Sequence, residues 1–470
     1  MVDGRIVWTG FDTCGTDFAA EFGCLRFFAS EQGFETAELQ ISLRHRDESH
    51  QFQTMNTDEF KRREVSRRQF LGRSAQQAAG VAVGVVGLTG VAAASAKSAE
   101  SPNERLGFGV IGVRNQGRLI ANELAQISGV EIRSLCDVDE SQFAPAIREV
   151  VDAGQMPPKT VRDFRHLLDD PAIDAVIIAT PDHWHATMAT LACQAGKDIY
   201  LESPATHSLT EDSALIEVVS RTQRIVQVGL QQRSGTHFQS AIQFLRSGKL
   251  GNVRFAKAWI VHRRKSIGRR AVVEAPAHVD YAAWLGPAPA RPFQPNRFHF
   301  NWRWFWEYGG GELAHWGVHM LDVARWGLQV ETPVRVSSVG GKYSFDDDQE
   351  TPDALTVQYD FGGKSILWEQ RLWSSHGVEG RSSGVAFHGD NGTLVVDRGG
   401  WKVYDHGEVI AADASDLLKT HLTNFTDCIR SRRTPAADLV TGVASGALCH
   451  WGNAAYRAGH EILVSNSNLT

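Results

Sequence analysis

The sequence predicts an α/β protein with two folded domains, a doubly wound parallel sheet followed by an α/β domain with a large, mostly antiparallel open sheet. Three observations support this prediction. Short apolar runs alternate with helical patterns over residues 105–229, a glycine-rich turn follows the first run, and seven runs with alternating faces occupy residues 253–404. A helical pattern returns from His421 to Ala458, and we expect residues 421–470 to pack back on both domains.

The first domain begins with the apolar strand Leu106–Ile111, which runs into the turn Gly112–Gly117 and then into a helical pattern. Backbone N–H groups at such a turn, together with the positive end of the helix, suit a pyrophosphate. The dinucleotide fingerprint is G-x-G-x-x-G, and Arg114 replaces its middle glycine. A second strand ends at Asp137, where an acidic residue takes the ribose hydroxyls. These features predict a Rossmann domain that binds NAD or NADP; the alternative is an ordinary βαβ unit with Asp137 as a solvated turn residue.

Asp137 favours NAD over NADP, because a carboxylate repels a 2′-phosphate. Further strands at residues 174–180, 198–202 and 225–229 alternate with helices at residues 186–195 and 211–220. Ligands of such a sheet lie beyond the carboxyl ends of its strands. The expected cofactor contacts at these ends are Gly112, Arg114, Asn115, Gln116, Asp137, Thr180, Pro181, His183, His185, Glu202 and Pro204. His183 and His185 are alternatively a loop residue and a helix-cap residue.

The second predicted domain, residues 230–420, contains candidate residues for a binding pocket. Its predicted strands are residues 253–262, 334–343, 354–361, 365–372, 384–389, 392–397 and 400–404. The densest aromatic cluster is residues 301–308, and indole rings with an arginine suit the apolar faces and hydroxyls of a sugar. We therefore expect Trp302, Arg303 and Trp306 in the pocket, the alternative being core packing and an oligomer interface. Arg263 lies in a short basic run that either contacts an anionic substrate group or is a solvated loop.

A stripe of polar residues follows the aromatic cluster. Glu312, His315, His319 and Asp322 are spaced three, four and three apart, so one helical face carries all four. We predict that the stripe faces the substrate, with Asp322 as a substrate contact. One alternative is a divalent metal bound by these four side chains, but one helix rarely supplies four ligands to one ion. The other is a structural network in which the four side chains satisfy one another or their neighbours.

Five segments, in this order, resemble the successive motifs of the glucose-fructose oxidoreductase and inositol dehydrogenase family (Gfo/Idh/MocA). They are residues 111–117, Cys136-Asp-Val-Asp139, residues 180–185, Tyr200-Leu-Glu-Ser-Pro204 and residues 309–322. The resemblance covers residues 105–460. It implies an N-terminal domain that holds NAD or NADP, and a second domain that builds a sugar pocket and offers its sheet for a homo-dimer or homo-tetramer. Members of the family mostly oxidise or reduce a sugar or polyol hydroxyl.

The resemblance also implies a catalytic set, which this chain changes at two of three positions. The family usually has a lysine in a Glu-Lys-Pro motif, joined by an aspartate and a histidine four residues apart. His319 matches the histidine, whereas His315 stands at the aspartate and Ser203 at the lysine. Serine forms hydrogen bonds but carries no charge. We expect His319 or His315 to accept the substrate proton, because imidazole titrates near neutral pH.

The N-terminal region predicts export. Ser66-Arg-Arg-Gln-Phe-Leu-Gly72 and the following small apolar stretch make residues 61–96 a twin-arginine signal peptide. We interpret residues 1–60 as an over-extended gene start or a disordered extension. The twin-arginine translocase moves folded proteins, which places the expected protein in the periplasm. Because that compartment offers no free NAD pool, the cofactor is expected to stay bound and to be recycled during catalysis.

Composition narrows the classes of function that remain. The formal net charge of −6 gives no support to a nucleic-acid partner. The cysteines show neither metal spacing nor a disulfide framework, so buried free thiols are expected. Three functions remain: an exported sugar or polyol oxidoreductase with a recycled cofactor, a redox-assisted glycoside hydrolase or lyase, and a non-catalytic sugar-binding relative.

Overall fold

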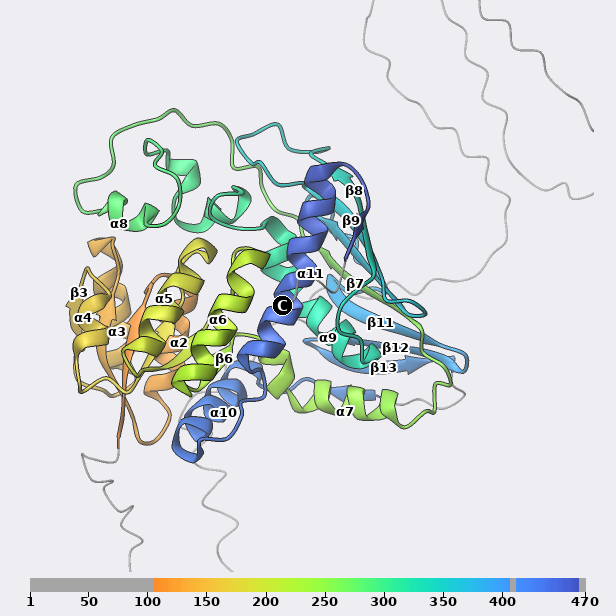
Figure 1. Ribbon diagram of the computed structural model, residues 1–470, viewed down its shortest axis with the longest axis horizontal. Helices are drawn as coiled ribbons and strands as arrows, with labels where there is room; N and C mark the ends of the chain where they lie inside the picture. The colour runs from red at the N-terminus through yellow and green to blue at the C-terminus, as the bar shows by residue number, and fades with distance from the viewer. Residues whose placement is uncertain (1–104, 406–410, 465–470) are drawn as a thin grey trace, which may run out of the picture. The chain divides into compact units, whose positions relative to one another are not determined.

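The computed structural model describes residues 105–405 and 411–464 of the chain (Figure 1). The predicted export signal and the extension before it lie outside the described residues. Within the described ranges, no helix has the length and hydropathy that a membrane crossing needs. The four cysteines there are buried thiols, as the sequence predicts.

The first domain is the predicted parallel sheet, with strands in the order β3-β2-β1-β4-β5-β6. Every neighbouring pair is parallel, so the carboxyl ends of the strands share one edge. The strands are β1 (Leu106–Ile111), β2 (Val130–Cys136), β3 (Lys159–Val161), β4 (Ala175–Ile178), β5 (Asp198–Leu201) and β6 (Val226–Val228). Sequence analysis missed β3, because this short edge strand is largely exposed and has no apolar run.

Helices connect these strands. They are α2 (Asn115–Ala125), α3 (Phe143–Asp152), α4 (Arg165–Asp169), α5 (Asp182–Gln194) and α6 (Leu209–Thr222). Because β1 leads directly into α2 and β4 into α5, the starts of both helices lie at the carboxyl edge of the sheet.

The second domain contains a nine-stranded sheet in the order β14-β13-β12-β11-β7-β10-β9-β8-β15. Strands β7 and β10 pair in parallel and the other neighbours are antiparallel, which confirms the predicted fold class. The strands are β7 (Phe255–Val261), β8 (Arg335–Gly341), β9 (Ala354–Asp360), β10 (Ser365–Arg371), β11 (Ser383–Gly389), β12 (Gly392–Asp397), β13 (Gly400–Tyr404), β14 (Ala411–Asp413) and β15 (Ile462–Leu463). The two short edge strands β14 and β15 were not predicted.

Helices of the second half cover this sheet and return to the first domain. They are α7 (Thr236–Arg246), α8 (Tyr281–Leu285), α9 (Val318–Leu328), α10 (Leu417–Ser431) and α11 (Leu439–Ala458). Helix α10 joins the core of the first domain, where Phe425 packs edge-on against Phe108 and Tyr200 at 6.2 and 5.9 Å between ring centroids. Helix α11 packs against β8, α9 and α6 and so connects the two domains.

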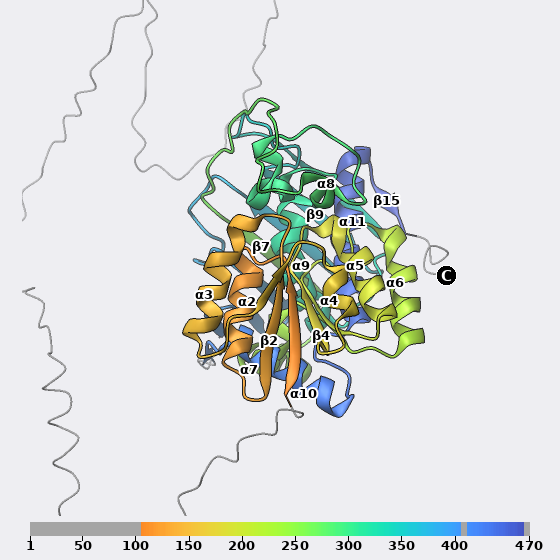
Figure 2. The same cartoon turned by 90° about the vertical axis from the view of Figure 1, so that its left-hand side faces the viewer.

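Residues 262–308, which we call the covering segment, leave β7 and lie against the carboxyl edge of the first sheet. Helix α8, within this segment, lies above the ends of α4 and α5 in Figures 1 and 2. The Asp280 backbone N–H donates to the Val138 carbonyl at 2.8 Å, and the Glu140 N–H to the His278 carbonyl at 3.1 Å. The Trp284 carbonyl also accepts a hydrogen bond of 3.0 Å from Trp184 Nε1. The edge where a nucleotide is expected is therefore covered by the second domain.

Candidate active site

A cavity of about 660 Å³ lies between the carboxyl edge of the first sheet, the covering segment and the start of α9. Nine of the eleven predicted cofactor residues line it: Gly112, Arg114, Asn115, Gln116, Asp137, Thr180, Pro181, His185 and Glu202. It also contains Ser203, Trp302, Arg303, His315 and His319. Groups from both domains thus face one cavity.

The turn between β1 and α2 is shaped by two glycines. Gly112 has φ +82°, a conformation that side-chain-bearing residues rarely adopt. A Cβ on Gly117 would lie 1.8 Å from the Gly112 carbonyl oxygen, so no side chain fits there. This close packing leaves the start of α2 facing the cavity, as phosphate binding requires.

We expect Gly117→Ala to remove bound nucleotide and to destabilise the protein by about 2 kcal/mol or more, because the overlap with Gly112 forces the turn to move. Mass spectrometry of nucleotide released on denaturation, with thermal unfolding in parallel, measures both effects. Gly446→Ala in α11 is the matched control, since its Cβ would meet nothing closer than 3.7 Å. Full nucleotide content in Gly117→Ala would contradict this role of the turn.

Asp137, the predicted ribose contact, is held in place by backbone groups. Its Oδ2 accepts from the Val113 N–H at 2.9 Å and its Oδ1 from the Asp139 N–H at 3.0 Å. Burial raises the pKa of this carboxyl to about 6. Nearby, the buried Thr180 hydroxyl has no partner among the described residues, although it lines the cavity. The turn, the carboxylate and this free hydroxyl fit the diphosphate and ribose of a dinucleotide.

Glu202 is a half-buried carboxylate that follows β5 and lines the cavity. Its Oε1 accepts from Gln116 Nε2 at 3.2 Å, and its Oε2 lies 3.4 Å from the Ser203 N–H. Loss of solvation raises its pKa to about 7, and the hydrogen bond from Gln116 opposes this shift only in part. A carboxyl that titrates near neutral pH is suited to proton transfer.

His315, His319 and Ser203 all line the cavity, and His319 lies close to Ser203. His319 Nε2 lies 3.5 Å from Ser203 Oγ, and the Nδ1 atoms of both imidazoles have no partner among the described residues. Burial, with the charge of Arg398, lowers the pKa of His319 to about 3. Burial, with the charge of Arg303, puts the pKa of His315 well below its usual range. Both side chains are neutral at pH 7, so the expectation that they titrate near neutrality was wrong for this cavity.

The four-residue stripe is not a metal site in this structure. A π-helical turn, residues 313–317, changes the helical phase between Glu312 and His319. Glu312 instead makes a two-point contact with Arg264 at 2.7 and 3.1 Å. Asp322 is likewise paired with Arg233, at 2.8 Å through two bonds, and does not line the cavity. Within the described ranges, no group of three or more metal-binding side chains is present.

Four other predicted residues also lie outside the cavity lining. Trp306 packs on the second domain, near Tyr456 and Arg457. Arg263 lines a separate hollow on the surface. His183 is buried, with Nε2 3.0 Å from the Trp284 carbonyl, so it anchors the covering segment. Pro204 is buried, and its carbonyl lies 2.7 Å from His185 Nδ1.

His185 lines the cavity, but both of its ring nitrogens lie within 2.9 Å of carbonyl oxygens, those of Pro204 and Thr180. Its role is therefore to connect the ends of two neighbouring strands. Sequence analysis also missed Arg398, in the turn between β12 and β13, whose guanidinium lies 4.6 Å from the Trp316 ring centroid. Arg398 lines the cavity and makes no salt bridge within the described residues. The Asp397-Arg-Gly399 sequence indicates only a hairpin turn and contains no signal for this position.

The fold and the cavity define a two-domain α/β protein of the dinucleotide-binding class. Its first domain matches the model of an oxidoreductase family NAD-binding Rossmann fold over residues 106–230. The second matches that family's C-terminal alpha/beta domain over residues 259–469. The chain belongs to the Gfo/Idh/MocA oxidoreductase family.

Several curated proteins are similar to part of the chain. A glycosyl hydrolase family 109 protein of Saccharopolyspora erythraea is 33% identical over 224 residues, 44% of this chain and 48% of that protein. An uncharacterised oxidoreductase of Bacillus subtilis is 32% identical over 149 residues, 32% of this chain and 42% of that protein. An alpha-N-acetylgalactosaminidase of Shewanella oneidensis is 28% identical over 162 residues, 34% and 35% of the two chains. The chain thus matches less than half the length of these relatives.

Solved structures share the fold at lower identity. An aldose-aldose oxidoreductase of Caulobacter crescentus, complexed with glycerol, has a TM-score of 0.60 at 19% identity, covering 77% of this chain and 100% of that one. A levoglucosan dehydrogenase in complex with NADH and levoglucosan has a TM-score of 0.60 at 18% identity, with the same coverage. These likenesses support the two-domain architecture.

Proposed function

We propose that this protein is an exported NAD-dependent oxidoreductase that acts on a hydroxyl of a sugar or polyol and retains its cofactor between turnovers. One observation carries the proposal: a single cavity joins the nucleotide turn and Asp137 to the group Glu202, Ser203, His315 and His319. The neighbours that bind NADH with levoglucosan, or glycerol, are in keeping with a sugar-like substrate.

The cavity contains suitable residues for each part of NAD. The Gly112 turn and the start of α2 would hold the diphosphate, and Asp137 the ribose hydroxyls. Thr180 and Glu202 lie at the ends of β4 and β5, where the nicotinamide half is expected. NAD, when bound, accepts a hydride from the carbon that carries the substrate hydroxyl.

The hydroxyl proton needs an acceptor within the protein. Glu202, with a pKa of about 7, is partly ionised at neutral pH and is the stronger base of the candidates. Neutral His319 and Ser203 are positioned to hydrogen-bond the hydroxyl and orient it. Arg398 supplies a positive charge in the cavity, which Ser203 cannot.

The covering segment supports cofactor retention. It is anchored to the first domain by backbone bonds at residues 278–280 and by the buried pair of His183 and Trp284. A nucleotide under it would leave only after those contacts opened. Export of the folded, loaded protein through the twin-arginine translocase to the periplasm, directed by residues 61–96, would then require that a second substrate or a later step return the hydride.

A panel of sugars and polyols added to the purified protein tests this function. We expect nucleotide released on denaturation to be NAD, and one substrate to produce the absorbance of reduced nicotinamide in the intact protein. Bound NAD with no spectral change across the panel would refute the oxidoreductase and favour a sugar-binding role. A protein without nucleotide, and without affinity for added NAD or NADP, would refute the whole proposal.

The second candidate is a redox-assisted glycoside hydrolase or lyase, which the similarity to glycosyl hydrolase family 109 proteins favours. Here oxidation would be transient, because the hydride returns after the glycosidic bond breaks. Cleavage of a glycoside in heavy water would then exchange the hydrogen on the carbon next to the oxidised one. Cleavage without that exchange, or no cleavage of any glycoside, would exclude this candidate.

A further inference from the structure

Arg303, in the covering segment, is a buried cation in the cavity with few protein contacts. Its Nε donates to the Phe300 carbonyl at 2.8 Å, and its guanidinium lies 4.1 and 5.1 Å from the ring centroids of Phe300 and Trp302. Its Nη1 has no acceptor among the described residues. Although burial lowers its pKa to about 10, Arg303 remains charged at neutral pH.

No acidic side chain among the described residues forms a salt bridge with this guanidinium, although Glu312 and Asp182 act on it electrostatically. Glu312 already makes its two-point contact with Arg264. Burial raises the pKa of Asp182 well above its usual range, and the charge of Arg303 opposes this shift. His315, His319 and Arg398 also line the cavity, and the nearby charges of Arg264 and Arg114 lower the pKa of Arg303 further. A buried charge without a partner is costly, so a counter-charge is expected from the ligand.

We propose that the substrate carries an oxyanion, the carboxylate of a sugar acid or the sulfate ester of a sugar, which pairs with Arg303. This inference rests on the proposed function and names its substrate class. The planar guanidinium can bind either group through two parallel hydrogen bonds, while Phe300 and Trp302 hold it in orientation. An anion here would also raise the pKa of His315, because it offsets the charge of Arg303 that now lowers it.

The wild-type protein, loaded with NAD, provides the first test. Binding is measured by calorimetry for matched sets: a hexose, its uronate, the neutral methyl ester of that uronate, and the hexose 6-sulfate. We expect the uronate or the sulfate of at least one sugar to bind about tenfold or more tighter than its neutral counterparts. A preference for the uronate alone assigns a carboxylate, and a preference for the sulfate alone assigns a sulfate ester. Equal binding of charged and neutral partners throughout would overturn the inference.

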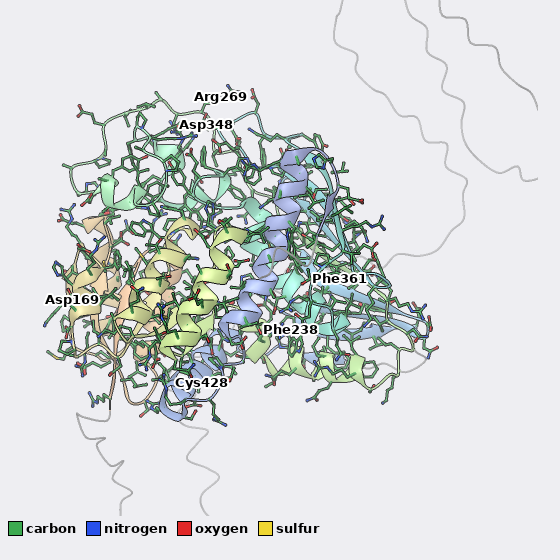
Figure 3. All side chains as sticks on the ribbon, viewed as in Figure 1. Asp169, Phe238, Arg269, Asp348, Phe361 and Cys428 are labelled. Carbon is green, nitrogen blue, oxygen red and sulfur yellow. The ribbon has the colours of Figure 1, made fainter. Side chains whose placement is uncertain are left out.

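Variants then assign the effect to one residue. Arg303→Gln should abolish the preference for the anion while leaving NAD content unchanged, and Arg303→Lys should retain part of it. Arg269→Gln is the control; Arg269 lies on the same segment but is exposed at the outer edge beside Asp348 (Figure 3), where it pairs with Asp346. Loss of NAD rather than of the anion preference in Arg303→Gln would assign this charge to the diphosphate and overturn the inference.

The two proposals fail separately. If neutral sugars are oxidised as well as their charged partners, the proposed oxidoreductase stands and the anionic substrate does not. If an anion binds through Arg303 without any reduction of the bound cofactor, the anion site stands and the oxidoreductase does not.

Discussion

Replacing Glu202 with glutamine is expected to stabilise the nucleotide-free protein by about 3 kcal/mol at pH 8 and to remove most of the activity of the NAD-loaded protein. The folded protein holds the carboxyl pKa near 7, raised mainly by burial from the usual 4.5. Ionising it at pH 8 therefore costs folding free energy, at about 1.4 kcal/mol per pKa unit. Glutamine keeps the shape and the contact with Gln116 but carries no charge to bury.

The sign of the pH dependence follows from the raised pKa. Between pH 4.5 and 7 the folded state binds more protons than the unfolded state, so wild-type stability falls as the pH rises through this range. The advantage of Glu202→Gln should thus be full at pH 8 and absent at pH 4.5, measured by thermal unfolding at both values. An equal gain at both pH values would show that repacking, and not charge, is the cause.

The same variant tests the proton acceptor. In the wild-type protein kcat/KM should rise about tenfold per pH unit below pH 7 and then level off, as the base ionises. In Glu202→Gln, kcat should fall about a hundredfold, and kcat/KM should no longer rise with pH below pH 7, with NAD still bound. If kcat/KM of Glu202→Gln still rose with pH below pH 7, another group would be the base.

His319→Gln is expected to lower kcat by about tenfold, because it removes the imidazole that would hydrogen-bond the substrate hydroxyl and orient it beside Ser203. Bound NAD should be unchanged, since the nucleotide turn lies on the first domain. Stopped-flow reduction of the bound cofactor separates this chemical step from cofactor exchange.

His315→Gln and His460→Gln complete this set. His315 lines the same cavity, whereas His460 is exposed near the C-terminal end of α11 and should behave as the wild type. A larger loss in His315→Gln than in His319→Gln would exchange the roles of the two imidazoles. Wild-type kcat in both His315→Gln and His319→Gln would show that neither histidine takes part in the mechanism.

Local sequence pattern predicted most of the fold. The strands of both sheets follow from apolar runs and from alternating faces, and only the short edge strands β3, β14 and β15 were missed. Edge strands of two or three residues contain too few side chains for either pattern. The nucleotide turn could also be predicted from the sequence. Gly112 and Gly117 are required by the backbone conformation and close packing of the turn itself, which involve only residues of the motif and its near neighbours.

The candidate site was predicted in part. Residues at strand ends reached the cavity, because parallel strands bring their carboxyl ends to one edge. Helical spacing failed for Glu312, since a π-helical turn follows it and changes the phase, and it failed for Asp322 because Arg233 pairs with that carboxylate. Arg264, from another element, likewise pairs with Glu312. The prediction that a histidine titrates near neutral pH and accepts the proton failed as well. Burial lowers the pKa of His319 and raises that of Glu202.

The order of β-strands and helices, the glycine turn and the exchange of lysine for Ser203 can all be read from the chain alone, since each depends on neighbours within a few residues. Which charges are paired depends on contacts between distant segments. The unpaired Nη1 of Arg303, the position of Arg398 and the near-neutral pKa of Glu202 arise only when the covering segment, the β12–β13 turn and the first sheet meet. Burial and charge pairing are properties of that assembled space, so tertiary structure decides them.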